Sequence, residues 1–246
     1  MYIYELHCHT QETSKCGKLP AAEMMEFYHK AGYTGVVVTD HFFNGNTTVT
    51  KYGSWEERVG LFRQGYLAAK KRGEELGLDV FFGWEFGHKG TDFLTYGLDI
   101  DWLLAHPFCD QLAVRDYSTL VRQSGGYLVQ AHPFREAQYI EMIRLLPRGV
   151  DAVEVCNGCR DDFTNLQAMH YAEVYGLPKS VGTDNHMGFR SHLTGVELSA
   201  RAESPAEILR AVVQGDAKLH LWRLHGTAED FTMEERPLTD KGDAEI

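Results

Sequence analysis

Short apolar runs alternate with helical patterns along most of the chain, and this alternation constrains the fold more than any other feature. The runs that predict strands are rich in β-branched and aromatic residues, and they span residues 2–6, 35–40, 79–86, 92–98, 126–132, 151–155, 179–184, 193–198 and 218–224. Strands that alternate with helices predict parallel pairing through right-handed crossovers. We therefore expect a single α/β domain over residues 1–225, followed by a polar, loosely held tail over residues 226–246.

The predicted helices have recognisable ends. Pro20 stands at the first position of one helix, where proline is tolerated. Ser54 and Glu57 form a capping box for a long helix that ends near Leu76, before Gly77. The later helices are predicted to begin at Asp116, at Asp161 or Asp162, and at Ser204.

Composition narrows the class of protein. The chain has 246 residues, of which 43% are hydrophobic, enough for one sizeable core. It contains neither an apolar stretch long enough to cross a membrane nor a leader pattern at residue 1, and its five cysteines are irregularly spaced. These features predict a cytoplasmic protein with free thiols. The net charge of −11 disfavours binding to extended nucleic acid.

The stretch "ELHCHT" places His7 and His9 two residues apart at the end of the first predicted strand. Side chains at positions i and i+2 of a strand point to the same face, so both imidazoles can reach one cation. Cys8, between them, is expected to point the other way.

Other predicted strands also end in residues that can bind metals. These are Asp40 and His41, Glu85, His132, and Asp184 and His186. In a parallel barrel the carboxyl ends of the strands meet at one mouth, where active sites are built. Imidazoles and carboxylates together suit Zn, Mn or Fe, and this many ligands predicts two or three divalent cations. Glu85 is the most telling, because an acid after the apolar "VFFGW" needs a cationic partner.

Some residues have a plainer interpretation. His29 and His170 lie in helical patterns, and His106, His192, His220 and His225 follow no comparable strand end. Asp40 either orients a ligand histidine or caps its strand, and we favour the first. The lone "CNGC" at 156–159 is more often incidental than a metal site. The sequence contains no P-loop, dinucleotide-binding glycine motif or Ser-His-Asp arrangement.

The order and spacing of five motifs resemble the polymerase and histidinol phosphatase (PHP) family over residues 3–200. The motifs are H-x-H-T, T-D-H after the second strand, a glutamate on a strand, "AHP" and G-T-D-x-H. The resemblance implies a distorted (βα)7 TIM-like barrel with a two- or three-metal site that hydrolyses phosphate esters.

The resemblance also implies a division of the ligands. His7, His9, Glu85 and Asp184 would hold the first metal, Glu85 and His132 the second, and His41 and His186 the third. The sequence departs from the family pattern twice. Cys16 lies nearest the place of an Asp or His ligand of the third metal, and its thiolate would favour Zn or Fe. Leu94 replaces a frequent histidine, so Asp92 would serve the second metal instead, with His88 a weaker substitute.

The leading hypothesis is a metal-dependent phosphatase acting on a small phosphorylated substrate, in which a metal-bound hydroxide attacks phosphorus in line. Arg135, in "HPFR", is the strongest candidate for a phosphate clamp, ahead of Arg160 and Arg190. Either Asp184 or His186 would protonate the leaving oxygen.

Three alternatives use the same site. A nuclease or phosphodiesterase is disfavoured by the low basic content. An amidohydrolase cleaving C–N bonds would usually have a bridging lysine, where this chain has Glu85. A non-catalytic metal-binding PHP module is disfavoured by the complete ligand set.

Overall fold

The computed structural model describes residues 1–238, and its centre is one ten-stranded sheet. The strands are β1 (Tyr2–Cys8), β2 (Gly35–Val38), β3 (Asp79–His88), β4 (Thr91–Tyr96), β5 (Tyr127–Ala131), β6 (Ala152–Asn157), β7 (Lys179–Gly182), β8 (His192–Leu198), β9 (Lys218–Gly226) and β10 (Phe231–Arg236). The α-helices are α1 (Ala21–Lys30), α2 (Trp55–Phe62), α3 (Gln64–Leu76), α4 (Ile100–Ala105), α5 (Val114–Gln123), α6 (Asp162–Tyr175) and α7 (Pro205–Gln214), with a short 3-10 helix at Cys109–Gln111.

The strand order is β10-β9-β8-β1-β2-β3-β4-β5-β6-β7. Pairing is parallel for β1 with β2, β2 with β3, β5 with β6 and β6 with β7. The remaining neighbours, including β3–β4, β4–β5 and β1–β8, are antiparallel. The fold is therefore a mixed α/β fold, and not the uniformly parallel arrangement that the alternation of elements predicts.

The sheet curls until its far end returns to β1. The residues after β7 meet the end of β1 in an isolated parallel bridge between Cys8 and Asn185. Two backbone hydrogen bonds hold this contact: His9 N donates to Asn185 O at 2.9 Å, and Asn185 N donates to His7 O at 3.1 Å. The curl brings the carboxyl ends of β1 and β7 side by side, although β7 lies at the end of the strand order.

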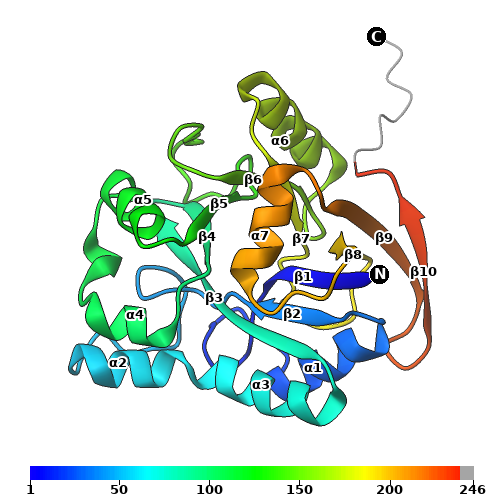
Figure 1. Ribbon diagram of the computed structural model, residues 1–246, viewed down its shortest axis with the longest axis horizontal. Coiled ribbons are helices and arrows are strands. Elements are labelled where there is room, and N and C mark those ends of the chain that lie inside the picture. Colours follow the sequence, from blue (N-terminus) through cyan, green and yellow to red (C-terminus); the bar gives the residue numbers. More distant parts are fainter. Residues whose placement is uncertain (239–246) are drawn as a thin grey trace.

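Helix α7 crosses the centre of the view in Figure 1 and packs inside the curl. Its apolar side chains Ile208, Leu209 and Val212 belong to one cluster with residues of the sheet such as Tyr96 and Val129. Helices α1 and α3 cover the outer face of β1 and β2. The polar strand ends described below lie on the same inner face of the sheet as α7, since Glu85 pairs with Leu94 of the α7 cluster.

The β3–β4 hairpin explains one departure from the parallel arrangement. The chain reverses at Lys89 and Gly90, which have φ values of 51° and 82°. Two successive residues with positive φ are typical of tight hairpin turns that join antiparallel strands. A turn of this kind leaves no room for the crossover that a parallel pair needs.

The expected helix ends are mostly confirmed. Ser54 and Glu57 form the capping box of α2, and Asp161 and Ser204 cap α6 and α7 through the backbone N–H of Thr164 and Glu207. The predicted long helix is interrupted at Arg63, so it forms α2 and α3 and ends at Gly77 in the left-handed region. Two helices begin at slightly different residues from those expected: Pro20 precedes α1, and Asp116 lies within the first turn of α5.

The C-terminal region differs from the expected loose tail. The expected boundary at 225/226 falls within β9, and Phe231–Arg236 pair with β9 as β10. Phe231 also contacts the rings of Phe27 and Phe189, which holds the hairpin against the body of the protein. The expected tail is therefore wrong for residues 226–236, and residues 239–246 lie outside the described part of the chain.

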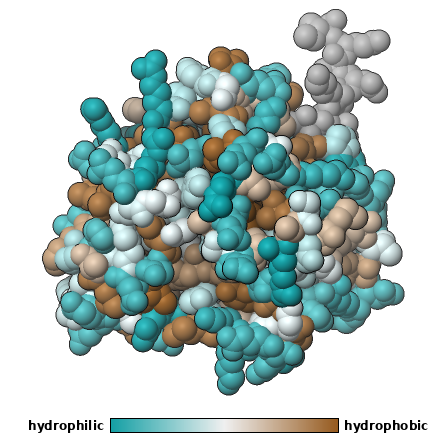
Figure 2. All heavy atoms as spheres, in the orientation of Figure 1, coloured by the Kyte–Doolittle hydropathy of each residue, from teal (hydrophilic) through white to brown (hydrophobic). Residues whose placement is uncertain are grey.

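Polar and apolar side chains are interspersed over the face shown in Figure 2. Within residues 1–238, no helix has the length and apolar character needed to span a membrane.

The close approach of β7 to its neighbours generates a stability prediction. A Cβ on Gly182 would lie 2.2 Å from Glu154 Oε1 and 2.5 Å from His7 Cβ. We expect Gly182→Ala to lower the free energy of unfolding by about 1–3 kcal/mol through overpacking, measured by urea denaturation. Gly60→Ala is the control, because Gly60 is helical with nothing within 4 Å of the added carbon, and it should gain about 0.5–1 kcal/mol. Equal stabilities for the two variants would contradict this packing.

Candidate metal centre

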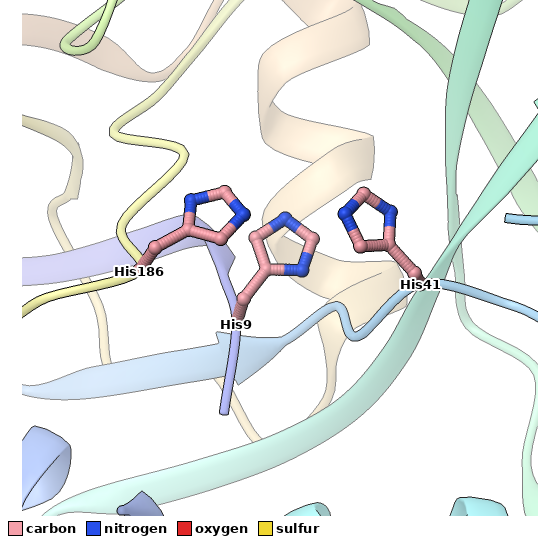
Figure 3. A group of neighbouring side chains, drawn as sticks. All are labelled: His9, His41 and His186. Atoms are coloured by element: carbon pink, nitrogen blue, oxygen red, sulfur yellow. The ribbon is translucent and has the colours of Figure 1, made fainter. Parts of the chain in front are cut away.

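Strand ends of the curled sheet deliver a cluster of imidazoles and carboxylates to one place. His7 and His9 stand at the end of β1, while Cys8 between them packs with Met24 and Val38 on the opposite face. The other side chains follow or end neighbouring strands: His41 after β2, Glu85 in β3, His132 after β5, and Asp184 and His186 after β7. Figure 3 shows the rings of His9, His41 and His186 pointing toward one another from three different segments.

The ligating atoms lie at close range. His7 Nε2 is 3.1 Å from His9 Nε2, and Asp184 Oδ1 lies 3.5 Å and 3.3 Å from these two nitrogens. Glu85 Oε1 lies 3.5 Å from His7 Nε2 and 3.2 Å from His132 Nε2. Among the described residues, three overlapping groups have ligand atoms within 4.8 Å of one another: His7–His9–Asp184, His7–Glu85–His132 and His9–His41–His186.

Hydrogen bonds fix the orientation of the first two rings. His7 Nδ1 lies 2.8 Å from Glu154 Oε1, so this nitrogen carries the proton. His9 Nδ1 lies 3.2 Å from Ser14 Oγ, whose own proton goes to Asp40 Oδ1 at 2.7 Å. Ser14 must therefore accept from His9, which places the proton of His9 on Nδ1 as well. Asp40 thus orients the ring of His9, a candidate ligand, through Ser14.

These orientations leave both Nε2 atoms directed at each other, which requires a positive charge between them. Glu85 Oε2 adds to the need for positive charge. This oxygen is buried and has no hydrogen-bond partner, although His41 Nδ1 lies only 2.6 Å from it. Bonds of about 2.1 Å from zinc to nitrogen or oxygen give ligand-to-ligand separations of about 3.0–3.5 Å. The distances in the cluster match these separations, so the residues present fit a divalent cation.

The pKa values of the cluster follow from burial and charge. Burial, together with the nearby His186 and His41, lowers the pKa of His9 well below its ordinary value. Burial opposes ionisation of Glu85 and Asp184, but the charges of His41 and His7 outweigh it and hold both carboxyl pKa values well below the usual range. A neutral imidazole and ionised carboxylates are the forms that bind metals.

His7 behaves differently in the metal-free cluster. Burial disfavours its charged form, but Glu154 and Asp184 outweigh burial and raise the pKa of His7 well above its ordinary value. A proton on His7 Nε2 would then donate to His9 Nε2. A divalent cation at the same place competes with this proton, so metal binding at His7 is expected to release it.

Cys16 lies beside the third group of ligands. Its Sγ is 3.0 Å from His41 Nε2. Burial raises the pKa of the thiol, but hydrogen bonds with His186 and His41 outweigh burial and lower it to about 6. The thiol of Cys16 thus lies beside His41, although Cys16 belongs to none of the three ligand groups found within residues 1–238.

Asp92 has a different partner from the expected one. Its Oδ2 accepts a hydrogen bond from Arg135 Nη2 at 2.8 Å, and Asp92 belongs to none of the three ligand groups found among the described residues. Arg135 also donates to the hydroxyl of Tyr139. In the structure, Asp92 therefore orients a guanidinium group.

Several candidate ligands form the floor of a cavity of about 590 Å³, namely Cys16, His41, Glu85, His132, Asp184 and His186, whereas His7 and His9 are not among its lining residues. Its walls include Arg135 and Arg160 together with polar residues of the 44–46 and 87–90 loops, whereas Arg190 is not among the lining residues. Arg160 Nη2 lies 3.0 Å from Asp184 Oδ2, so this guanidinium reaches the ligand cluster directly. The cavity offers cationic groups above an acidic floor.

Sequence reasoning missed Glu154 and Ser14, the two residues that orient His7 and His9. Glu154 carried a readable signal, because an acid in the apolar run "DAVEV" resembles Glu85 in "VFFGW". Ser14 carried none, since a serine in a polar loop is unremarkable. The "CNGC" cysteines are free, and Cys156 is buried in the apolar core.

Comparison with known proteins supports the fold. No family model matches the chain, and no curated protein matches it. A solved structure from Bacteroides vulgatus, described as a two-domain protein containing a predicted PHP-like metal-dependent phosphoesterase, aligns with a TM-score of 0.64 at 14% identity over 90% of this chain and 64% of that one. This chain shares its fold with that structure and spans less than two thirds of its length.

Two further solved structures are similar in fold to this chain. PsfC from Pseudomonas syringae aligns with a TM-score of 0.57 at 19% identity, over 84% of this chain and 86% of that one. An amidohydrolase from Chromobacterium violaceum, with bound sulfate and no metal, aligns with a TM-score of 0.52 at 15% identity, over 75% and 87% of the two chains. Fold similarity alone thus leaves phosphoesterase and amidohydrolase chemistry both open.

The geometry predicts that the purified protein binds divalent cations tightly. We expect elemental analysis to find two or three per chain, because three ligand groups share the centre. Removal by a chelator should lower the melting temperature, since a ligand that binds only the folded state at a hundred times its Kd stabilises it by about 2.7 kcal/mol. Glu85→Gln should retain less metal and respond less to the chelator. A metal-free protein whose melting temperature ignores chelation would contradict the assignment.

Proposed function

We propose that the protein is a metal-dependent phosphatase that hydrolyses small phosphate monoesters. The observation that carries the proposal is the floor of the cavity, where buried histidines and carboxylates surround a place that requires positive charge, with two arginine side chains beside it. Phosphate is the anion that suits both, because its oxygens bind cations and match the fork of a guanidinium.

The proposal assigns the ligands as follows. His7, His9, Glu85 and Asp184 would hold one cation, Glu85 and His132 a second, and His41 and His186, with Cys16, a third. Glu85 would serve the first two, which fits its position within 3.6 Å of both His7 and His9 and 3.2 Å from His132. The strands β1 to β7 correspond to the seven strands of the (βα)7 barrel on this proposal.

The chemistry divides between the cations and the chain. Divalent cations of this kind lower the pKa of water and neutralise phosphate oxygens. Arg135 and Arg160 hold the phosphate from the other side, since Asp92 and Asp184 fix their guanidinium groups at the cavity wall. Positioning of this kind supplies much of the catalysis in phosphoryl transfer.

The proton for the leaving oxygen has two candidate sources. Asp184 is the poorer donor, because surrounding histidines outweigh burial and hold its pKa well below the usual range. Burial opposes the charged form of His186, but Cys16 and Asp184 outweigh it and raise the pKa of that imidazole. We therefore assign the donor role to His186 in the state that holds only the first two cations, in which its ring is not a ligand.

A substrate panel tests the proposal. We expect the protein, loaded with Mn²⁺ or Zn²⁺, to hydrolyse p-nitrophenyl phosphate and simple sugar phosphates with higher kcat/KM than bis(p-nitrophenyl) phosphate, a single-stranded oligonucleotide or N-acyl amino acids. A preference for the diester or oligonucleotide would establish the nuclease alternative. Cleavage of the amides would establish an amidohydrolase, and metal binding without any turnover would indicate a non-catalytic module.

The bridging role of Glu85 predicts a ranking among variants. Glu85→Gln should nearly abolish turnover, because it removes an anion shared by two cations, and each loss of about 1.4 kcal/mol costs tenfold in rate. Cys16→Ala should retain a measurable fraction, because Cys16 lies in a loop where water can replace the thiolate. Arg190→Ala is the control outside the cavity. The measurement is kcat with metal content for all three, and a dead Cys16→Ala beside an active Glu85→Gln would reverse the assignment.

A further inference from the structure

One buried carboxylate, that of Glu154, contacts two of the candidate ligand histidines at once. It lies in β6 with 1% of its surface exposed. Oε1 is 2.8 Å from Nδ1 of His7, and Oε2 accepts from the backbone N–H of His132 at 2.8 Å. Oε2 also accepts from Asn157 Nδ2 at 2.8 Å.

The two histidines depend on this carboxylate in different ways. For His7, the contact places the ring proton on Nδ1 and leaves Nε2 to face the centre. For His132, the contact holds the backbone, which has a φ of 24° directly after the last residue of β5. Sparsely populated backbone conformations of this kind cost about 1–3 kcal/mol and persist only where surrounding contacts hold them.

Both histidines approach the same atom. His7 Nε2 and His132 Nε2 lie 3.5 Å and 3.2 Å from Glu85 Oε1, and the two rings stack with centroids 5.6 Å apart. Glu154 thus sits behind the pair that converges on the bridging carboxylate. It is not among the residues that line the cavity, and the backbone of Gly182 lies against its Oε1. It therefore cannot touch a substrate in the cavity.

We infer that Glu154 is a positioning residue that aims His7 and His132 together at the metal pair bridged by Glu85. The inference deepens the proposed function and rests on its metal site. All three groups around Glu154 donate protons, so only an ionised carboxylate, which accepts at both oxygens, satisfies all of them. A neutral amide of the same shape offers one acceptor oxygen and must turn its own N–H groups toward a donor.

The test is the affinity for metal itself. Glu154→Gln should bind Zn²⁺ and Mn²⁺ about 10–100-fold more weakly, the effect typical of losing a group that orients a metal ligand. The measurement is competition with a chromophoric chelator, on variants shown to be folded by circular dichroism. The affinity for both metals of the pair that shares Glu85 should fall, since the substitution frees His7 and His132 together.

Glu5→Gln is the matched control. Glu5 is an equally buried carboxylate in β1, but it accepts from the backbone N–H of His7 and from groups such as Tyr28 Oη and the backbone N–H of Thr183, without contact to a ligand ring. Its variant should lose stability with less effect on metal affinity. Wild-type affinity in folded Glu154→Gln, or an equal loss in Glu5→Gln, would overturn the inference.

A second readout does not depend on the variant folding. Nitrogen NMR of the wild-type imidazoles should show His7 protonated on Nδ1, both metal-free and metal-bound. A His7 ring protonated only on Nε2 in the metal-free protein would overturn the inference. These outcomes are separable from failure of the proposed function, because metal affinity and ring protonation are measured without a substrate. An affinity loss in Glu154→Gln alongside an inactive wild type would retain the inference and reject the phosphatase.

Discussion

Two imidazole nitrogens, His7 Nε2 and His9 Nε2, are held 3.1 Å apart with carboxylate oxygens around them. The rest of the site depends on this contact. Neither ring is free to turn away, because Glu154 holds His7 and Ser14, backed by Asp40, holds His9. The arrangement is repulsive unless positive charge occupies the centre. The curl of the sheet matters for the same reason, because it is the bridge between Cys8 and Asn185 that brings Asp184 to the end of β1.

The candidate ligands were predictable from sequence because they obey local rules. Side-chain alternation in "ELHCHT" places His7 and His9 on one face, and an acid in an apolar strand marks Glu85. The antiparallel pairs were not predictable in the same way, because a run of β-branched residues does not state the direction of its neighbour. The turn at Lys89–Gly90 carried the relevant signal, and β10 was missed because its run of charged residues, Glu234 to Arg236, resembles a loop.

The pairing register of β3 and β4 explains why Asp92 pairs with Arg135 and not with the candidate metal ligands. In the β3–β4 hairpin Leu94 lies directly opposite Glu85, and Asp92 lies opposite Gly87, two residues further toward the turn. Asp92 shares the face of Glu85 but stands nearer the rim of the cavity, where Arg135 pairs with it at 2.8 Å. A motif comparison counts positions along one strand, whereas the distance to the cluster depends on pairing between strands.

Part of the acidic character of the chain is concentrated in buried carboxylates around the end of β1. Glu5, Asp40, Glu85, Glu154 and Asp184 are each at most 4% exposed and surround the end of β1, among the C-terminal ends of the strands. Glu5 and Asp40 show the cost: burial outweighs their hydrogen bonds and raises their carboxyl pKa values to about 7 and about 6. The carboxyl pKa values of Glu85 and Asp184 are not raised by burial, because the nearby histidine charges outweigh it. A divalent cation supplies such charge in place of the histidine protons with which it competes, so the same buried acids that make the metal-free fold costly make cation binding and folding one coupled process.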